Sequence, residues 1–374
     1  MSKPSRGFVV FSGYNSRAVI AFARAMAHQE VPFCLVARDG ADEILRTRFA
    51  NRVAAIRPDR SLDPQRLAAL LDEVRERTGF GRLVLAPTTE SLNRVFLEHR
   101  ELFASGGVDV PLVAQKLYRE LSDKLPFTEL CRAHGIAVPA AIDDPRQAPL
   151  PFVAKPIAYD LVNPVAPMLI CKEEERRAFV ARPDMDRFFL QSYVGGRSLY
   201  LLLHVGLDQQ VLSFSQENFI QQPHGKSIVA ACPSDFHHSE EAARYVSMLL
   251  AVGFRGLAMI EVREHQGRFA MIECNPRMWG PSQLFVDAMG TNLFEAFARD
   301  HGFPCSVRPL LARTDCRYFW FGGLLDALQG NSSPTFHAYS ARRLAAELPI
   351  WMENDIFRRE DSLDLFADTF EAGR

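Results

Sequence analysis

The sequence has no long apolar run, no paired-cysteine motif and little net charge, and each absence excludes a class of protein. No stretch of the 374 residues approaches the roughly 20 apolar residues that a membrane-spanning helix needs. Lys and Arg total 43 against 45 Asp and Glu, a formal charge of −2, so neither nucleic acid nor a membrane surface is expected as the main partner. Seven scattered cysteines without a C-x-x-C pair, and a polar start unlike a secretory signal, favour a reduced, cytoplasmic chain without structural zinc.

Glycine-rich phosphate-binding motifs are missing as well. The turn Ser12-Gly13-Tyr14-Asn15-Ser16 holds a single glycine, so the dinucleotide fingerprint is absent. We interpret Ser12 and Asn15 as helix-capping residues rather than ligand contacts. No signature of a serine or cysteine triad is present, so no side-chain nucleophile is expected.

The N-terminal part of the chain alternates short apolar runs with segments of helical spacing. The expected strands cover residues 7–11, 31–37 and 82–86. This β-α-β succession predicts a doubly wound parallel sheet. Open sheets of this type bind ligands beyond the carboxyl ends of their strands, so Thr89 and Glu90 are candidate substrate contacts.

Residues 256–280 carry the strongest pattern. Two apolar, alternating runs are joined by a polar turn that ends in Gly267, which predicts a β-hairpin. Because side chains alternate between the faces of a strand, Glu273 and Asn275 must share a face. Glu261 lies at about the same distance from the turn, so it is expected opposite Glu273.

This face would carry two carboxylates and an amide oxygen among residues that otherwise predict a core. Burying two unneutralised carboxylates for structure alone is too costly. Hard cations bind such oxygens, and Mg²⁺ is usually held by one or two carboxylates together with substrate phosphates. Arg277 adds a fork suited to a phosphate or carboxylate, so we interpret the pattern as a Mg²⁺-nucleotide site. The alternative is an exposed sheet edge whose acids pair with Arg263, Arg268 and Arg277.

Glu261, followed after the hairpin by Glu273-Cys-Asn275-Pro-Arg277, resembles the metal-binding signature of the ATP-grasp enzymes, and of carboxylate–amine ligases in particular. The resemblance implies an α/β chain with the ATP-grasp fold, in which an α+β nucleotide domain follows a doubly wound N-terminal domain. It implies ATP and one or two Mg²⁺ ions, or Mn²⁺, with Glu261, Glu273 and Asn275 as metal ligands. It covers residues 116–300 strongly, 7–115 by arrangement only, and 301–374 hardly at all.

Two lysines resemble the phosphate-binding residues of this family. Lys124 follows Asp123 at the expected start of a helix, and its alternative is a solvated lysine. Lys155 ends a short apolar strand, where a point charge suits phosphate oxygens. The next segment, 157–167, departs from the family because it has no glycine to wrap phosphate. Either side chains such as Tyr159 and Asn163 replace the missing backbone donors, or closure over phosphate is weaker.

The stretch from Gln191 to Ser198 resembles the family's hinge, E-x-x-(I/V)-x-G-x-E, which binds adenine and ribose. The resemblance implies nucleotide contacts by Gln191, Ser192, Val194 and Ser198. Gln191 stands in place of an acid and can still accept or donate one hydrogen bond. Ser198 is too short to replace a bidentate ribose contact, which puts ribose affinity in doubt.

Further residues are implied as substrate or catalytic groups. Lys226 lies where related ligases bring a basic residue to the γ-phosphate, and Lys226 and Arg277 are the implied catalytic residues. His224 is a candidate substrate contact; a plain surface loop is the alternative for His224 and Lys226. Trp279, just after the hairpin, is a candidate pocket wall.

The resemblance divides the chain into an N-terminal Rossmann-like domain (1–115), an ATP-grasp domain (116–300, with lobes 116–190 and 191–300) and a C-terminal segment (301–374). The last is expected to be mostly helical, with a buried aromatic cluster at 318–321 and no chemistry of its own.

The implied activity is ATP-dependent joining of a small carboxylate to an amine through an acyl-phosphate, giving an amide or peptide bond. Amino acids are the expected substrates, and a homodimer is an option. One alternative is a relative that activates bicarbonate, like biotin carboxylase. Another, of a different class, is a nucleotide-binding sensor or scaffold without turnover.

Overall fold

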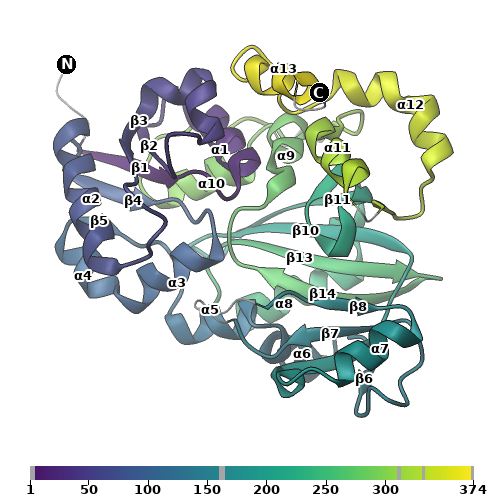
Figure 1. Ribbon diagram of the computed structural model, residues 1–374. Coiled ribbons are helices and arrows are strands. Elements are labelled where there is room, and N and C mark those ends of the chain that lie inside the picture. The colour runs from purple at the N-terminus through teal and green to yellow at the C-terminus, as the bar shows by residue number, and fades with distance from the viewer. Residues whose placement is uncertain (1–4, 160–164, 310–312, 331–332, 372–374) are drawn as a thin grey trace.

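Three sheets organise the computed structural model, which describes residues 5–159, 165–309, 313–330 and 333–371 (Figure 1). The N-terminal domain lies at the left of Figure 1, the large sheet at the centre, and a small lobe at the lower right. Within the described residues, no helix is long and apolar enough to cross a membrane.

The N-terminal sheet has five parallel strands in the order β3-β2-β1-β4-β5. The strands are β1 (Arg6–Phe11), β2 (Phe33–Ala37), β3 (Val53–Ile56), β4 (Arg82–Leu85) and β5 (Val108–Asp109). The helices are α1 (Ser16–His28), α2 (Pro64–Thr78), α3 (Glu90–Glu98) and α4 (Arg100–Ser105). The near-continuous burial of β1 and β2 is typical of strands covered on both faces. The predicted doubly wound sheet is confirmed.

The small lobe holds an antiparallel sheet in the order β6-β9-β7-β8. Its strands are β6 (Ala141–Ile142), β7 (Phe152–Pro156), β8 (Met168–Ile170) and β9 (Phe188–Ser192). The neighbouring helices are α5 (Gln115–Ser122), α6 (Lys124–Ala133) and α7 (Glu173–Val180). Phe152, Phe179 and Phe188 form its aromatic core, with ring centroids 6.3 and 5.6 Å apart along the chain of contacts. One face of the sheet is therefore sealed by α7, and the other is left for the site.

The large sheet has seven strands, in the order β14-β13-β10-β11-β12-β15, with β16 paired to β11. The strands are β10 (Arg197–Val205), β11 (Val211–Gln221), β12 (Ile228–Pro233), β13 (Gly256–His265), β14 (Arg268–Asn275), β15 (Tyr318–Phe319) and β16 (Thr335–Phe336). The remaining helices are α8 (Glu240–Ala251), α9 (Gln283–Ala288), α10 (Leu293–Asp300), α11 (Phe321–Gln329), α12 (Ala341–Glu353) and α13 (Leu363–Glu371).

The C-terminal segment is more than the helical addition that was expected. Tyr318 and Phe319 are fully buried, as predicted for this aromatic cluster, but they form strand β15 rather than part of a helix. β15 pairs with β12, and β16 pairs with β11. The segment thus adds two strands to the large sheet. Their pairing partners lie far away in the sequence, so no local pattern predicts these strands.

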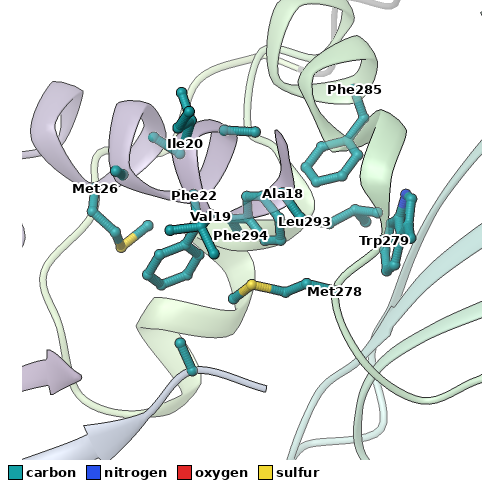
Figure 2. Close-up of a cluster of buried hydrophobic side chains, with 14 of the residues drawn as sticks. Ala18, Val19, Ile20, Phe22, Met26, Met278, Trp279, Phe285, Leu293 and Phe294 are labelled. Atoms are coloured by element: carbon teal, nitrogen blue, oxygen red, sulfur yellow. The ribbon is translucent and has the colours of Figure 1, made fainter. Parts of the chain in front are cut away.

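A shared hydrophobic cluster joins the N-terminal domain to the chain that follows the hairpin (Figure 2). Phe22 of α1 packs edge-on against Phe294 of α10, with ring centroids 5.2 Å apart. Phe285 of α9 packs against Trp279 at 5.6 Å. Figure 2 shows Met278 and Trp279 in the same cluster as the side chains of α1, α9 and α10. The division of the chain at residues 115 and 300 stays a prediction, because this core runs across both boundaries.

The turn before α1 is fastened to distant segments and does not cap its own helix. Asn15 Nδ2 donates to the carbonyls of Thr88 and Met278 at 3.4 and 3.3 Å, and its side chain makes no capping hydrogen bond. Ser12 Oγ donates to Asp42 Oδ1 at 2.9 Å. The interpretation as helix caps was wrong for Ser12; Asn15 does occupy the N-cap position of α1, but tertiary contacts take up its side chain.

Candidate active site

The hairpin of β13 and β14 brings the predicted metal ligands together. Glu261 pairs with Glu273, and Met259 pairs with Asn275, so the expected cross-strand pairing is confirmed. Tyr200 of β10 pairs with Glu261 on the same face. Glu261 and Asn275 are only 5% and 8% exposed. The exposed-edge alternative is wrong for Glu261 and Asn275, which lie inside the protein, whereas Glu273 is partly exposed at the cavity.

Two lysines reach this face from the small lobe. Lys124, the first residue of α6, forms an ion pair with Glu273. Lys155, on β7, is 6% exposed and donates from Nζ to the carbonyl of Ile272 at 2.8 Å. The structure therefore brings together the predicted phosphate-binding lysines, from α6 and β7 of the small lobe, and the predicted metal ligands of the large sheet.

The electrostatics of the two carboxylates differ. Burial raises the pKa of Glu261, although the charge of Arg263 opposes the shift. Burial also acts to raise the pKa of Glu273, but the charge and hydrogen bond of Lys124 outweigh it and lower that pKa to about 2. Burial and the nearby charge of Lys124 lower the pKa of Lys155 to about 8. The site thus holds one firmly ionised carboxylate and one lysine that loses its proton readily.

Two arginines complete the hydrogen bonding of this face. Arg263 donates to Glu261 Oε1 at 2.8 Å. Arg277 donates to Asn275 Oδ1 at 3.1 Å and to the Met278 carbonyl at 2.8 Å. These contacts leave Arg277 without a carboxylate partner in the part of the chain that the structure describes.

The donor set fits a hard divalent cation. Carboxylate and amide oxygens are the ligands that Mg²⁺ prefers, and here Glu261, Glu273 and Asn275 present them on one face, with Glu261 and Asn275 buried and Glu273 open to the cavity. Nowhere in the described residues do three or more His, Cys, Asp or Glu side chains gather as a separate metal cluster. The two carboxylates are neutralised by Lys124 and Arg263, so a cation bound here would share their negative charge with these side chains.

A cavity of about 570 Å³ opens beside this face, between the N-terminal domain and the large sheet. Glu90, Lys226 and Trp279, which were predicted as substrate or catalytic residues, line it together with Glu273, Asn275 and Arg277. The N-terminal domain contributes residues of two turns that follow strand ends: Tyr14 and Asn15 after β1, and Thr88 with the predicted Thr89 and Glu90 after β4.

Trp279 forms both a wall of the cavity and a part of the core. Its side chain is 2% exposed and packs on Phe285 (Figure 2). Its Nε1 is buried and has no hydrogen-bond partner among the described residues. Lys226, by contrast, is exposed at the rim. The side chain of His224 and the whole of Asn163 lie outside the described residues, as does most of the loop between Tyr159 and Val165.

An ion network that the sequence analysis missed lies behind Glu90. Arg94 pairs with Glu90 at 2.7 Å and with Asp123 at 2.6 Å, and its guanidinium lies 4.7 Å from the Tyr159 ring centroid. Asp123 also accepts from the Tyr159 backbone at 3.1 Å. The spacing of Glu90 and Arg94, four residues apart at the start of a helix, was a usable signal for half of this network.

The sequence matches no family model and no curated protein, but solved structures match its fold. The biotin carboxylase–β,γ-ATP complex from Campylobacter jejuni superimposes with a TM-score of 0.62 at 12% identity, covering 84% of this chain and 74% of that one. The chain has the ATP-grasp fold.

Two other solved structures agree. The biotin carboxylase domain dimer of 2-oxoglutarate carboxylase from Hydrogenobacter thermophilus, in complex with MgADP and bicarbonate, gives a TM-score of 0.61 at 14% identity and covers 85% and 74% of the two chains. N5-carboxyaminoimidazole ribonucleotide synthetase from Thermus thermophilus gives 0.60 at 16% identity and covers 83% and 81%. At such identities the likeness shows the fold alone, so the role of each residue rests on the geometry above.

The hinge of the ATP-grasp fold departs most from what was expected. Gln191 pairs with Val153, two residues before Lys155, so it shares the cleft face of the small lobe; it is 2% exposed. Ser192 is held by the Ala140 carbonyl at 3.3 Å, and Val194 lies in the turn. None of these residues lines the cavity described above.

Ser198 is closed off from any ligand in this structure. It is 0% exposed, and its Oγ accepts from Asn218 Nδ2 at 3.1 Å. The structure therefore does not place Ser198 where it would contact ribose, because neighbouring side chains of the large sheet cover it.

His337, from the C-terminal segment, reaches the same end of the site face. Arg263 donates to His337 Nδ1 at 2.7 Å, so Nε2 carries the hydrogen and donates to Gln221 Oε1 at 3.0 Å. Burial and the charge of Arg263 lower the pKa of His337 to about 3. The expectation that residues 301–374 hold no chemistry stays a prediction, although His337 of this segment contacts the arginine that pairs with Glu261.

Proposed function

We propose that the protein is an ATP-dependent carboxylate–amine ligase that forms an amide or peptide bond and releases ADP and phosphate. One observation carries the proposal: Glu261, Glu273 and Asn275 share one face that Lys124 and Lys155 approach from the opposite lobe. Oxygens for a hard cation beside two lysines suit a metal-bound polyphosphate. A location in the cytoplasm and a homodimer, such as the H. thermophilus domain forms, belong to the same proposal.

The residues act by positioning and by neutralising charge. Mg²⁺, held by Glu261, Glu273 and Asn275, would supply charge stabilisation on the phosphates. Lys124, Lys155 and Arg277 balance negative charge while an oxygen of the substrate carboxylate bonds to the γ-phosphorus and the bond to ADP breaks. The amine nitrogen then bonds to the acyl carbon, phosphate leaves with the C–O electron pair, and the nitrogen loses a proton. Lys226 is proposed to approach the γ-phosphate from the rim.

The network behind Glu90 supports an amine-bearing substrate. Glu90 and Asp123 share the single guanidinium of Arg94, so this corner of the cavity has more negative than positive charge. An ammonium group would be attracted there, and Trp279 contributes an apolar wall to the same cavity. Amino acids are therefore the proposed substrate class.

The test is phosphate release from ATP with Mg²⁺, or Mn²⁺, across a grid of amino acids and small carboxylates, with mass spectrometry of the products. Release that needs both an acid and an amine, with a product lighter than their sum by one water, is the expected result. Release that needs bicarbonate instead would replace the proposal with a carboxylase. Tight nucleotide binding without release anywhere on the grid would favour a sensor or scaffold.

A further inference from the structure

Arg17, on the first turn of α1, crosses from the N-terminal domain to the large sheet. It donates to Ser227 Oγ at 2.6 Å, to the Tyr318 hydroxyl at 3.1 Å and to the Ile228 carbonyl at 3.2 Å. Its guanidinium lies 3.9 Å from the centroid of the Trp320 ring. These contacts hold the charge in one place, whereas a surface arginine would move freely.

This fixed charge faces the cavity and lacks a carboxylate partner. Arg17, Lys226 and Arg277 all line the cavity, and none of them forms an ion pair with an acid in the part of the chain that the structure describes. Of the two acids of the lining, Glu273 is paired with Lys124, and Glu90 shares the guanidinium of Arg94 with Asp123. An excess of positive charge in a partly buried space is costly, so this part of the cavity fits an anion.

The start of α1 adds to the positive character. Asn15 is the N-cap residue, but its side chain donates to Thr88 and Met278 instead of accepting from the first turn. Tyr14, Asn15 and Arg17 all line the cavity, so the amide end of this 13-residue helix lies at its wall. Helix N-termini attract anions through these amides and the helix dipole.

Gly280 makes room for the guanidinium. A Cβ on Gly280 would lie 3.0 Å from Arg17 Nη2, closer than most such contacts, and the other near atoms are also of this guanidinium. A larger residue after Trp279 would therefore require the guanidinium to shift by a few tenths of an ångström.

We infer that Arg17 and the N-terminus of α1 form a subsite for a substrate oxyanion other than the carboxylate that is activated. That the bound anion is a substrate rests on the proposed function, but the preference of the subsite for an anion can be measured without turnover. Three sources supply this chemistry: a side-chain carboxylate, the α-carboxylate of an amino acid, and a phosphate ester.

Binding of matched pairs to the full chain tests the inference by calorimetry. The pairs are glutamate and glutamine, alanine and alaninamide, and phosphoserine and serine, one pair for each source of oxyanion. We expect wild type to bind the anionic member of one pair roughly 10- to 100-fold more tightly, as charged hydrogen bonds are lost in its partner. R17Q should abolish the preference. R82Q, which removes an exposed arginine paired with Asp109 in the same domain, should retain it.

G280A provides a second variant that keeps the guanidinium and moves it. We expect a weaker but measurable loss of preference, whereas G40A, where an added Cβ meets nothing within 4 Å, should match wild type. Unfolding midpoints near that of wild type would show that the variants fold. No preference in wild type, a preference that R17Q retains, or no binding of any pair at millimolar concentration would overturn the inference.

The inference and the ligase proposal fail separately. Phosphate release on the substrate grid with every KM unchanged in R17Q would overturn the subsite and leave the ligase. An Arg17-dependent preference in binding, without release on any substrate, would do the reverse.

Discussion

The two ends of the site face of the large sheet differ in a way that bears on function. At the hairpin end, Glu273 and Asn275 border an open cavity and meet a lysine of the small lobe. At the hinge end, Ser198 is fully buried and Arg263 is held by His337, so hydrogen bonds within the protein satisfy these two side chains. The first end borders open space, whereas at the second, which we call the saturated end, Ser198 and Arg263 are already paired and Gln191 Oε1 alone of the hinge side chains named above is buried without a partner among the described residues.

This contrast follows the resemblance to the ATP-grasp enzymes: one end keeps the residues of the family's signature, and the other has different residues. The hairpin end keeps every residue of the metal signature, and the hinge end has Gln191 and Ser198 where the resemblance implies acids. The C-terminal segment adds two short strands to the sheet, paired with β11 and β12. Phosphate handling and base recognition are therefore expected to respond very differently to mutation.

The largest effect is expected at the hairpin end, from Glu273→Gln. Gln keeps the oxygen that accepts from Asn275, so the fold should persist, but the charge offered to a cation and to Lys124 is lost. We expect phosphate release to fall on the order of 100- to 1,000-fold, as when one group that stabilises developing charge is removed. E264Q, on the same hairpin but paired with Arg197, is the control. Full activity in E273Q, with native circular dichroism, would refute the metal assignment.

The second prediction concerns the saturated end, through His337. Its pKa is about 3 in the fold, against about 6.5 unfolded, so between these values the unfolded chain binds more protons. Stability is then lost as the pH falls below about 6.5, by about 1.4 kcal/mol per pH unit from this residue. Denaturant unfolding at pH 6.5 and 4.5 should show this loss in wild type and its removal in H337Q. The exposed His134 provides the control variant H134Q, which should keep the wild-type slope; an equal slope in H337Q would contradict the prediction.

How much of this contrast the sequence predicts depends on the distance between partners. Glu261 and Glu273 were placed opposite each other because strand alternation is a local rule, and the structure agrees. His337 meets Arg263 across 74 positions, and Asn15 meets the Met278 carbonyl across 263, so no local pattern announces either contact. Ser198 shows the limit of local patterns. Its position in the hinge could be predicted from the sequence, but its burial depends on side chains of other strands, such as Asn218.

The third prediction returns to the hairpin end and concerns Lys155. Its pKa is lowered to about 8 by burial and by Lys124, so the charged form that binds phosphate is present below pH 8 and is lost above it. We expect kcat/KM for ATP, which reports the free enzyme, to fall up to about tenfold per pH unit above this value. In K155Q, kcat/KM for ATP should be roughly tenfold lower at pH 7, and the fall above pH 8 (the alkaline limb of the profile) should be absent. K172Q, at the exposed start of α7, is the control, and a limb that persists in K155Q would assign it to another group.

The smallest effects are expected at the hinge, where mutation of Gln191 and mutation of Ser198 should affect ATP binding differently. Gln191 Oε1 is buried and has no partner among the described residues, so it is expected to accept a hydrogen bond from the base. Q191L should then weaken ATP by about 5- to 10-fold and erase any preference for ATP over ITP, which lacks the amino group. Ser198 already bonds to Asn218, so S198A should change the KM for ATP less than about threefold and cost about 1 kcal/mol of stability. If S198A instead weakened ATP more than Q191L did, the hinge would have to open on binding, and the saturated end would be a closed state of the same site.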